Sequence, residues 1–146
     1  MLGQRLILTV ILAALGAPSA QALCSFSGTT GGSLKANTFV GFIYSNNPAT
    51  TIITTDTADT YEVVLSPVTD FATAPVGVFM PIPAVMSGSL SGANNGSLSG
   101  SPSGGYLADL PNIGDSTLSV NVVDAEENVL KAGSYVINST VTCIAQ

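Results

Sequence analysis

TLSVNVV, residues 117–123, decides the fold of this 146-residue chain. Its apolar side chains Leu118, Val120 and Val122 alternate with polar ones. A period of two residues is the pattern of a β-strand that buries one face and exposes the other. We therefore expect a half-buried strand here, with these three residues in the core.

The next part of the chain repeats the pattern. DAEEN, residues 124–128, is a polar turn, and most side chains of one parity in residues 134–143 are apolar. These side chains are Tyr135, Ile137, Val141 and Cys143. The sequence predicts a second, long strand over 134–143 that points Cys143 inward.

Further strands are expected where β-branched and aromatic residues lie between turn sequences. Helical periodicity is nearly absent after the first residues, so the chain is predicted to be an all-β antiparallel sandwich of about seven to eight strands. One candidate strand begins near Cys24. The others cover residues 38–44, 51–54, 61–65, 76–80 and 106–110.

Residues 1–22 have the three parts of a secretory signal peptide. Arg5 supplies the positive charge, residues 6–15 the apolar run, and residues 20–22 an A-x-A cleavage site. We expect a mature single domain over 23–146 in the periplasm, on the cell surface or outside the cell. No later run approaches the roughly 18 apolar residues of a membrane span, so no transmembrane anchor is expected after cleavage.

Cys24 and Cys143 bracket the expected mature chain, and both fall on the apolar parity of their segments. A metal site would need about four ligands, and redox pairs usually lie close in sequence. A structural disulfide is therefore favoured. Closing a loop of about 120 residues would stabilise the fold by about 4 to 5 kcal/mol in the chain-entropy model.

Catalytic groups are scarce. The chain has no histidine, which removes Ser-His-Asp and Cys-His mechanisms together with the common zinc sites. Glu126 and Glu127 are expected to be solvated acids of a turn, and Asp56 and Asp59 are weak candidates for calcium ligands. No catalytic residue and no cofactor is expected, and the chain is predicted not to be an enzyme.

The mature chain is acidic and poor in charge. Lys35 and Lys131 are its only basic residues against nine acidic ones, and charged residues make up 8% of the sequence. A basic surface for nucleic acid is absent, so nucleic acid is excluded as a partner. The abundance of Ser, Thr, Gly and Asn indicates the neutral, hydroxyl-rich surface of an exported protein.

A Ser/Gly-rich tract over 87–105 contains a duplication. GSLSG at 88–92 recurs as GSLSG at 96–100. Its composition favours a long flexible loop. The alternative is a pair of short strands on which Leu90 and Leu98 present an apolar edge to a partner.

PVGVFMPIPAVM, residues 75–86, precedes this tract. Pro81 and Pro83 keep the stretch out of the centre of a sheet, so part of it is expected at an edge or in a loop. Its apolar side chains are candidates for a protein interface, and the alternative is that they close one end of the core. The interface candidates are Val78, Phe79, Met80, Ile82, Val85 and Met86.

Residues 118–141, with LKAGSY at 130–135, resemble the last strands of bacterial fimbrial and spore-coat-U-like β-sandwich subunits. The resemblance implies an immunoglobulin-like sandwich that a periplasmic chaperone and an outer-membrane usher assemble into surface fibres. In that family each subunit lends an N-terminal strand to its neighbour. This chain departs from the pattern, because only Leu23 would precede Cys24 after cleavage and no donor strand is visible.

Two functions are compatible with these features. The first is a secreted, non-enzymatic structural or adhesive protein of the cell surface, such as a fimbria-associated subunit, that binds protein partners or itself. The alternative is a secreted module that binds a carbohydrate or another small ligand. The absence of Trp and the 6% aromatic content disfavour sugar stacking, so the first function is preferred.

Overall fold

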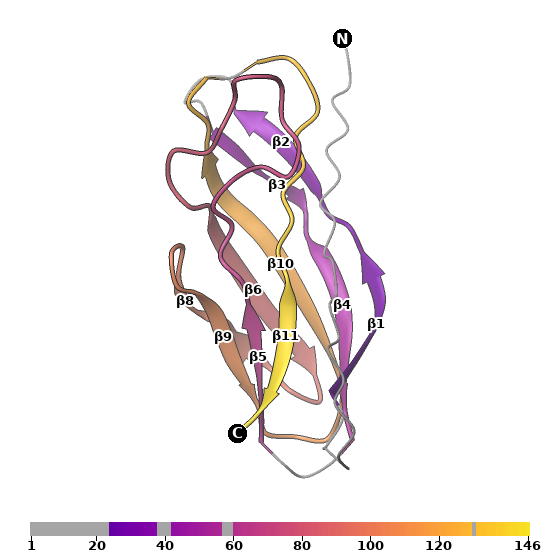
Figure 1. Cartoon of the computed structure of the whole chain (residues 1–146). Helices are drawn as coiled ribbons and strands as arrows, with labels where there is room; N and C mark the ends of the chain where they lie inside the picture. The colour runs from indigo at the N-terminus through magenta and orange to yellow at the C-terminus, as the bar shows by residue number, and fades with distance from the viewer. Residues whose placement is uncertain (1–23, 38–41, 57–59, 130) are drawn as a thin grey trace.

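The computed structural model describes residues 24–37, 42–56, 60–129 and 131–146. In these ranges the chain forms eleven β-strands and no helix. The strands build two antiparallel sheets that form the layers of an elongated molecule (Figure 1). The all-β prediction is confirmed and the two sheets fit a sandwich, but the eleven strands of the described ranges exceed the predicted seven to eight. The predicted signal peptide, residues 1–22, lies outside the described residues.

The first sheet is built around one long strand. Its seven strands are β1 (Cys24–Thr30), β2 (Ser33–Asn37), β3 (Phe42–Asn47), β4 (Ala49–Thr55), β6 (Val85–Gly92), β7 (Gly96–Ser97) and β10 (Gly114–Glu126). β10 pairs with β4 and then with β3, and it also pairs with β6. The register moves by one residue around Pro48, because Val120 pairs with Ala49 whereas Ala125 pairs with Ile43. β1 and β2 pair with β4 and β3 from outside.

The second sheet is shorter. Its strands, in spatial order, are β11 (Val141–Ala145), β5 (Tyr61–Leu65), β9 (Gly105–Leu110) and β8 (Ser99–Ser101). Beyond it, the segments 66–84 and 127–140 complete the second layer without regular strands (Figure 1). Side chains from both segments belong to the same core cluster as Leu34 and Ile43 of the first sheet.

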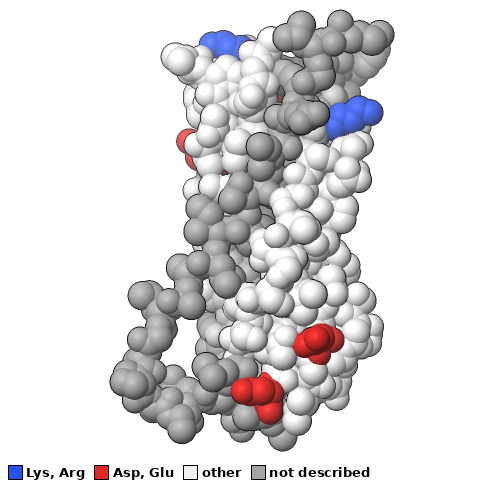
Figure 2. Space-filling view, turned by 90° about the vertical axis from the view of Figure 1, so that its right-hand side faces the viewer, with Lys and Arg blue, Asp and Glu red and all other residues white. Residues whose placement is uncertain are grey.

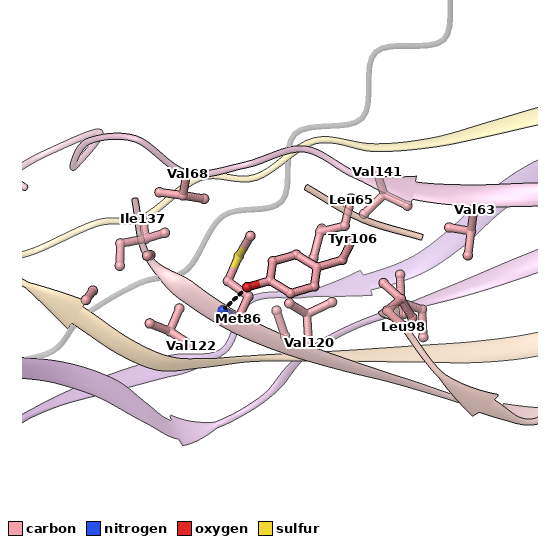
Figure 3. Packing of buried hydrophobic residues seen from close by; sticks show 14 of the residues in the cluster. Val63, Leu65, Val68, Met86, Leu98, Tyr106, Val120, Val122, Ile137 and Val141 are labelled. Atoms are coloured by element: carbon pink, nitrogen blue, oxygen red, sulfur yellow. Dashed lines mark hydrogen bonds between the residues drawn. The ribbon is translucent and has the colours of Figure 1, made fainter. Parts of the chain in front are cut away.

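The core follows the two-residue period of the strands. Leu118, Val120 and Val122 of β10 are buried, which confirms the expectation for residues 117–123. Val63 and Leu65 of β5 are also buried in the same cluster. Figure 3 shows side chains of both sheets meeting in this layer, with the Tyr106 hydroxyl accepting a hydrogen bond from the Met86 N–H at 3.0 Å.

The Ser/Gly-rich tract is not a loop. It forms the end of β6 and all of β7 and β8, and both leucines of the duplication are buried rather than presented at an edge. Leu98 lies directly on Gly88: a Cβ at Gly88 would be only 3.0 Å from its side chain, and the Leu98 N–H donates to the Gly88 carbonyl at 2.9 Å. A larger residue at this position would force the Leu98 side chain to move. The tract therefore carries the chain from the first sheet to the second and closes that side of the core.

Two other strand predictions need correction. Residues 76–80 form turns instead of a strand. Residues 134–140 bury Tyr135, Ile137 and Ser139 alternately, as predicted, but their only β-bridge joins Val136 to Thr73. Alternating burial here comes from packing on the core, without the ladder of hydrogen bonds that defines a strand.

The disulfide between Cys24 and Cys143 is present as predicted. It joins β1 of the first sheet to β11 of the second, with a Cα–Cα distance of 6.2 Å and a sequence separation of 119 residues. β1 and β11 are outer strands of their sheets. The bond therefore links the two layers on the side of the sandwich opposite β7 and β8.

Candidate contact surface

The irregular half of the second layer is held together by Asn128. Its N–H donates to the carbonyl of Phe79 at 3.1 Å, and its side-chain oxygen accepts from the Phe79 N–H at 2.9 Å. Its side-chain nitrogen donates to the carbonyl of Gly77 at 3.2 Å. One asparagine thus satisfies three backbone groups of residues 77–79 and fixes this turn against the segment 127–140.

A second connection involves Lys131. Its ammonium donates to the carbonyl of Val76 at 2.7 Å. The buried Tyr135 hydroxyl accepts from the Lys131 N–H at 3.0 Å and donates to the Lys131 carbonyl at 2.8 Å. Nearby, Gly133 approaches Pro75 so closely that a Cβ on the glycine would be 2.6 Å from the proline ring.

Asp70 and Phe71 hold another part of the segment 66–84 in place. One carboxylate oxygen of Asp70 accepts hydrogen bonds from the N–H groups of Phe71 and Met80, at 2.8 and 3.1 Å. Phe71 packs edge-to-face on Tyr135 with ring centroids 5.3 Å apart. These contacts fix the backbone of residues 70–80 although it contains no regular strand.

Large apolar side chains project from this ordered loop region. Val76 is 94% exposed, Phe79 50%, Ile82 48% and Val129 44%. We call these four residues the apolar end. Leu107, Ile113, Val123 and Ile144 are exposed to a similar degree elsewhere, so what distinguishes the apolar end is that hydrogen bonds fix its loops.

The structure separates the six predicted interface candidates. Phe79 and Ile82 are exposed, and Val78 and Val85 are half-buried. Met80 and Met86 are buried in the core and cannot reach a partner. The stretch therefore closes the core with Met80 and Met86 and leaves Phe79 and Ile82 exposed, and these two remain candidates for an interface.

Val129 was missed from the sequence, and Val76 lay inside the predicted stretch without being one of the six named candidates. Val76 lies in the same apolar stretch but directly after a proline, and Val129 lies in another segment that follows the acidic turn. The hydrogen bonds of Asn128 to Phe79 and Gly77 connect this segment to residues 77–79. No local pattern in the sequence signals that contact.

Charged side chains lie close to the apolar end although charge is scarce in the chain as a whole. Figure 2 shows a face that is mostly uncharged, with basic side chains toward one end and acidic ones mainly toward the other. Lys131, whose ammonium binds the Val76 carbonyl, is at the apolar end. Asp70 and Glu126, both exposed, lie in or next to the segments that carry the apolar end, so a partner must also accommodate these charges.

The predicted acidic candidates do not form a catalytic pair. Asp56 lies exposed at the end of β4, and Asp59 lies outside the described residues. Glu126 is exposed at the end of β10. Glu127 is only 9% exposed, which corrects the expectation of a solvated turn acid. Burial, strengthened by the negative charges of Asp124 and Glu126 and opposed by a backbone hydrogen bond, raises the pKa of the Glu127 carboxyl above its ordinary value of 4.5.

Acidic and cysteine side chains are dispersed over the described ranges. No group of three or more acidic or cysteine side chains is arranged there to hold a metal ion. No helix in these ranges is long and apolar enough to cross a membrane. Comparison of the chain with protein-family models, with curated proteins and with solved structures finds no match.

Proposed function

We propose that the protein is an exported, non-enzymatic component of the cell surface that works by assembly or adhesion. The apolar end is the observation that carries the proposal. Its four side chains are exposed on loops whose backbone is already fixed by Asn128, Lys131 and Asp70. A partner would bury apolar area there without first having to order the loops, so little conformational entropy opposes binding.

Export is supported by the cysteine chemistry and by the sequence. A disulfide that joins two sheets persists in an oxidising compartment and is rare in the cytosol. Residues 1–22 have the composition of a signal peptide, and we propose that they are removed. The mature protein then acts in the periplasm, on the cell surface or outside the cell.

The fimbrial resemblance suggests the setting. We place the chain as an immunoglobulin-like, fimbria-associated subunit, with a periplasmic chaperone as an assembly partner. The two-sheet antiparallel architecture is compatible with this placement. Because no donor strand precedes Cys24 after the predicted cleavage, the proposed contact uses the apolar end instead of an exchanged strand.

The test replaces two apolar side chains with serine at matched exposure. Phe79→Ser/Ile82→Ser changes the apolar end, and Ile113→Ser/Ile144→Ser changes two isoleucines elsewhere that are 56% and 49% exposed. Self-association is measured by sedimentation velocity, and surface attachment by antibody labelling of intact cells. We expect the first variant to fold with its disulfide intact yet lose association or attachment, while the control retains both. A folded Phe79→Ser/Ile82→Ser protein that assembles and attaches like the wild type would refute the proposal.

A further inference from the structure

Two neighbouring asparagines, Asn94 and Asn95, follow the end of β6 in the Ser/Gly-rich tract. Asn94 is only 2% exposed, and its side-chain nitrogen and oxygen bond to Asn112 and Ser116. Asn95 is exposed. The same side chain thus occurs twice in succession, once held in the interior and once open to water.

Asn95 is also the one asparagine of the chain that a glycine follows. The amide carbon of an asparagine side chain can be attacked by the backbone nitrogen of the next residue, and a side chain on that residue hinders the attack. Gly96 has no side chain, and an added Cβ would meet no other atom within 4 Å. The space beside the attacking nitrogen is therefore open.

The backbone here is held only at the end of a short ladder. Gly96 begins β7, which has two residues and pairs with β6 alone, and it lies opposite Leu90. Backbone pairs at the ends of edge strands open far more easily than those of core strands. The Gly96 nitrogen is therefore released from its pairing without unfolding of the core.

The hydrogen bonds of the Asn95 side chain are equally accessible. Its nitrogen donates to the carbonyl of Gly92 at 2.9 Å, and its oxygen accepts from the Gly92 N–H at 3.3 Å. Both bonds lie at the surface, so water can replace them at little net cost when the side chain turns toward Gly96.

We propose that Asn95 deamidates spontaneously in the folded protein. The Gly96 nitrogen loses its proton to hydroxide and forms a bond to Asn95 Cγ, and the side-chain nitrogen leaves as ammonia. Water then opens the resulting five-membered imide. Cleavage of the bond between Cγ and the Gly96 nitrogen gives aspartate, and cleavage of the bond to the backbone carbonyl carbon gives isoaspartate. One water is consumed and one ammonia is released, and no other reactant is needed.

The modification alters the hairpin that β6 and β7 form. Aspartate at position 95 has no N–H to donate to the Gly92 carbonyl, and isoaspartate lengthens the backbone directly before β7. Leu98, which packs on Gly88, follows three residues later, so a displaced β7 would loosen this side chain. The site stands independently of the proposed surface function, because it rests on the hairpin alone.

The experiment follows the mature, oxidised protein during incubation at 37 °C in dilute buffers of pH 7 and pH 8. Chymotrypsin cleaves after leucine, so digestion of unfolded, reduced samples releases residues 91–98 with both asparagines. Fragmentation in a mass spectrometer assigns the mass increase of one unit to Asn94 or to Asn95. We expect the increase at Asn95 alone, at a rate about ten times higher at pH 8 than at pH 7, because the attacking nitrogen must first lose its proton.

Two variants connect the chemistry with the hairpin. Asn95→Gln keeps an amide but would have to form a less favoured six-membered ring, so it should stay unmodified over the same period. Asn95→Asp carries one product from the start. Amide hydrogen exchange at Leu98 should become faster in the aged wild type and in Asn95→Asp, and should stay slow in aged Asn95→Gln.

The same incubation in guanidinium chloride gives the rate of the unfolded chain. Conversion of Asn95 in guanidinium chloride but not in the folded protein would overturn the proposal, because the fold would then protect the site. Equal conversion of Asn94 and Asn95 in the folded protein would also overturn it, because burial would then have no influence. Unchanged exchange at Leu98 after complete conversion would overturn the proposed effect on the hairpin.

Discussion

Leu98 offers the sharpest test of how the Ser/Gly-rich tract contributes to stability. Its side chain is 9% exposed and rests on Gly88, where the chain passes from β7 to β8. Leu98→Ala would remove three buried carbons and leave a cavity over a residue that has no side chain to fill it. Substitutions of this kind cost about 2 to 5 kcal/mol. We expect about 3 kcal/mol, because Leu98 lies at the side of the core, where neighbours can partly close the gap.

Leu107→Ala provides a control with the same chemical change. Leu107 lies on β9, pairs with Ser99 of β8 and is 41% exposed. Much of its side chain contacts water already, so the expected loss is about 1 kcal/mol. Urea unfolding of the oxidised proteins gives both free energies of unfolding under the same conditions, provided that the slopes agree.

Hydrogen exchange checks the same packing without a mutation. The Leu98 N–H donates to the Gly88 carbonyl at 2.9 Å and should exchange slowly, as core amides do. Rapid exchange at Leu98 would contradict a packed strand. So would a loss for Leu98→Ala that is no greater than the loss for Leu107→Ala, since a flexible loop would tolerate both changes equally.

Two further predictions concern the Cys24–Cys143 disulfide and the buried carboxyl group of Glu127. Replacing both Cys24 and Cys143 with alanine should lower the free energy of unfolding by about 4 to 5 kcal/mol. The disulfide joins residues separated by 119 positions, so its loss leaves the unfolded chain far less restricted. Urea unfolding that shows a loss below about 1 kcal/mol would contradict this prediction. The pKa of Glu127 is raised in the folded state, so its contribution to stability is fully present below the unfolded pKa and is lost as pH rises through the folded pKa. In cation-free buffer, the Glu127→Gln protein should therefore be more stable than the wild type at neutral pH and should match it near pH 4. The free energy of unfolding is measured across this pH range for both proteins. A constant difference between them would refute the raised pKa of Glu127.

The sequence predicted the regular part of the fold because side-chain alternation reports burial directly. Residues 61–65 form β5 with the predicted bounds, and 117–123 lie within β10. The disulfide could be predicted because Cys24 and Cys143 each share the parity of the apolar side chains in their segment. The chain has no other cysteine and no histidine that could pair with them or bind a metal with them. These inferences depend only on the period of a strand and on the chemistry of cysteine.

The errors have equally specific causes. Composition indicated a loop at 87–105, yet Ser-Leu-Ser within each repeat already has the strand period, and Gly88 supplies the space that Leu98 fills. Glu127 was expected in solvent because no sequence pattern marks the bulge between Val122 and Asp124. A shift of one residue reverses every following side chain, so an undetected bulge changes a surface acid into a buried one.

The exposed apolar side chains and the buried Glu127 occur in the same irregular part of the second layer for a structural reason. Where β11, β5, β9 and β8 cover the first sheet, backbone groups are paired in ladders and the surface is determined by alternation. Where the segments 66–84 and 127–140 form the second layer, individual side chains such as Asn128 and Asp70 must satisfy the backbone instead. Such a layer can expose Phe79 and bury Glu127 without disturbing the sheets. The sandwich therefore supplies stability at one end and leaves the other free to carry contacts, which is where loops on a rigid scaffold usually place function.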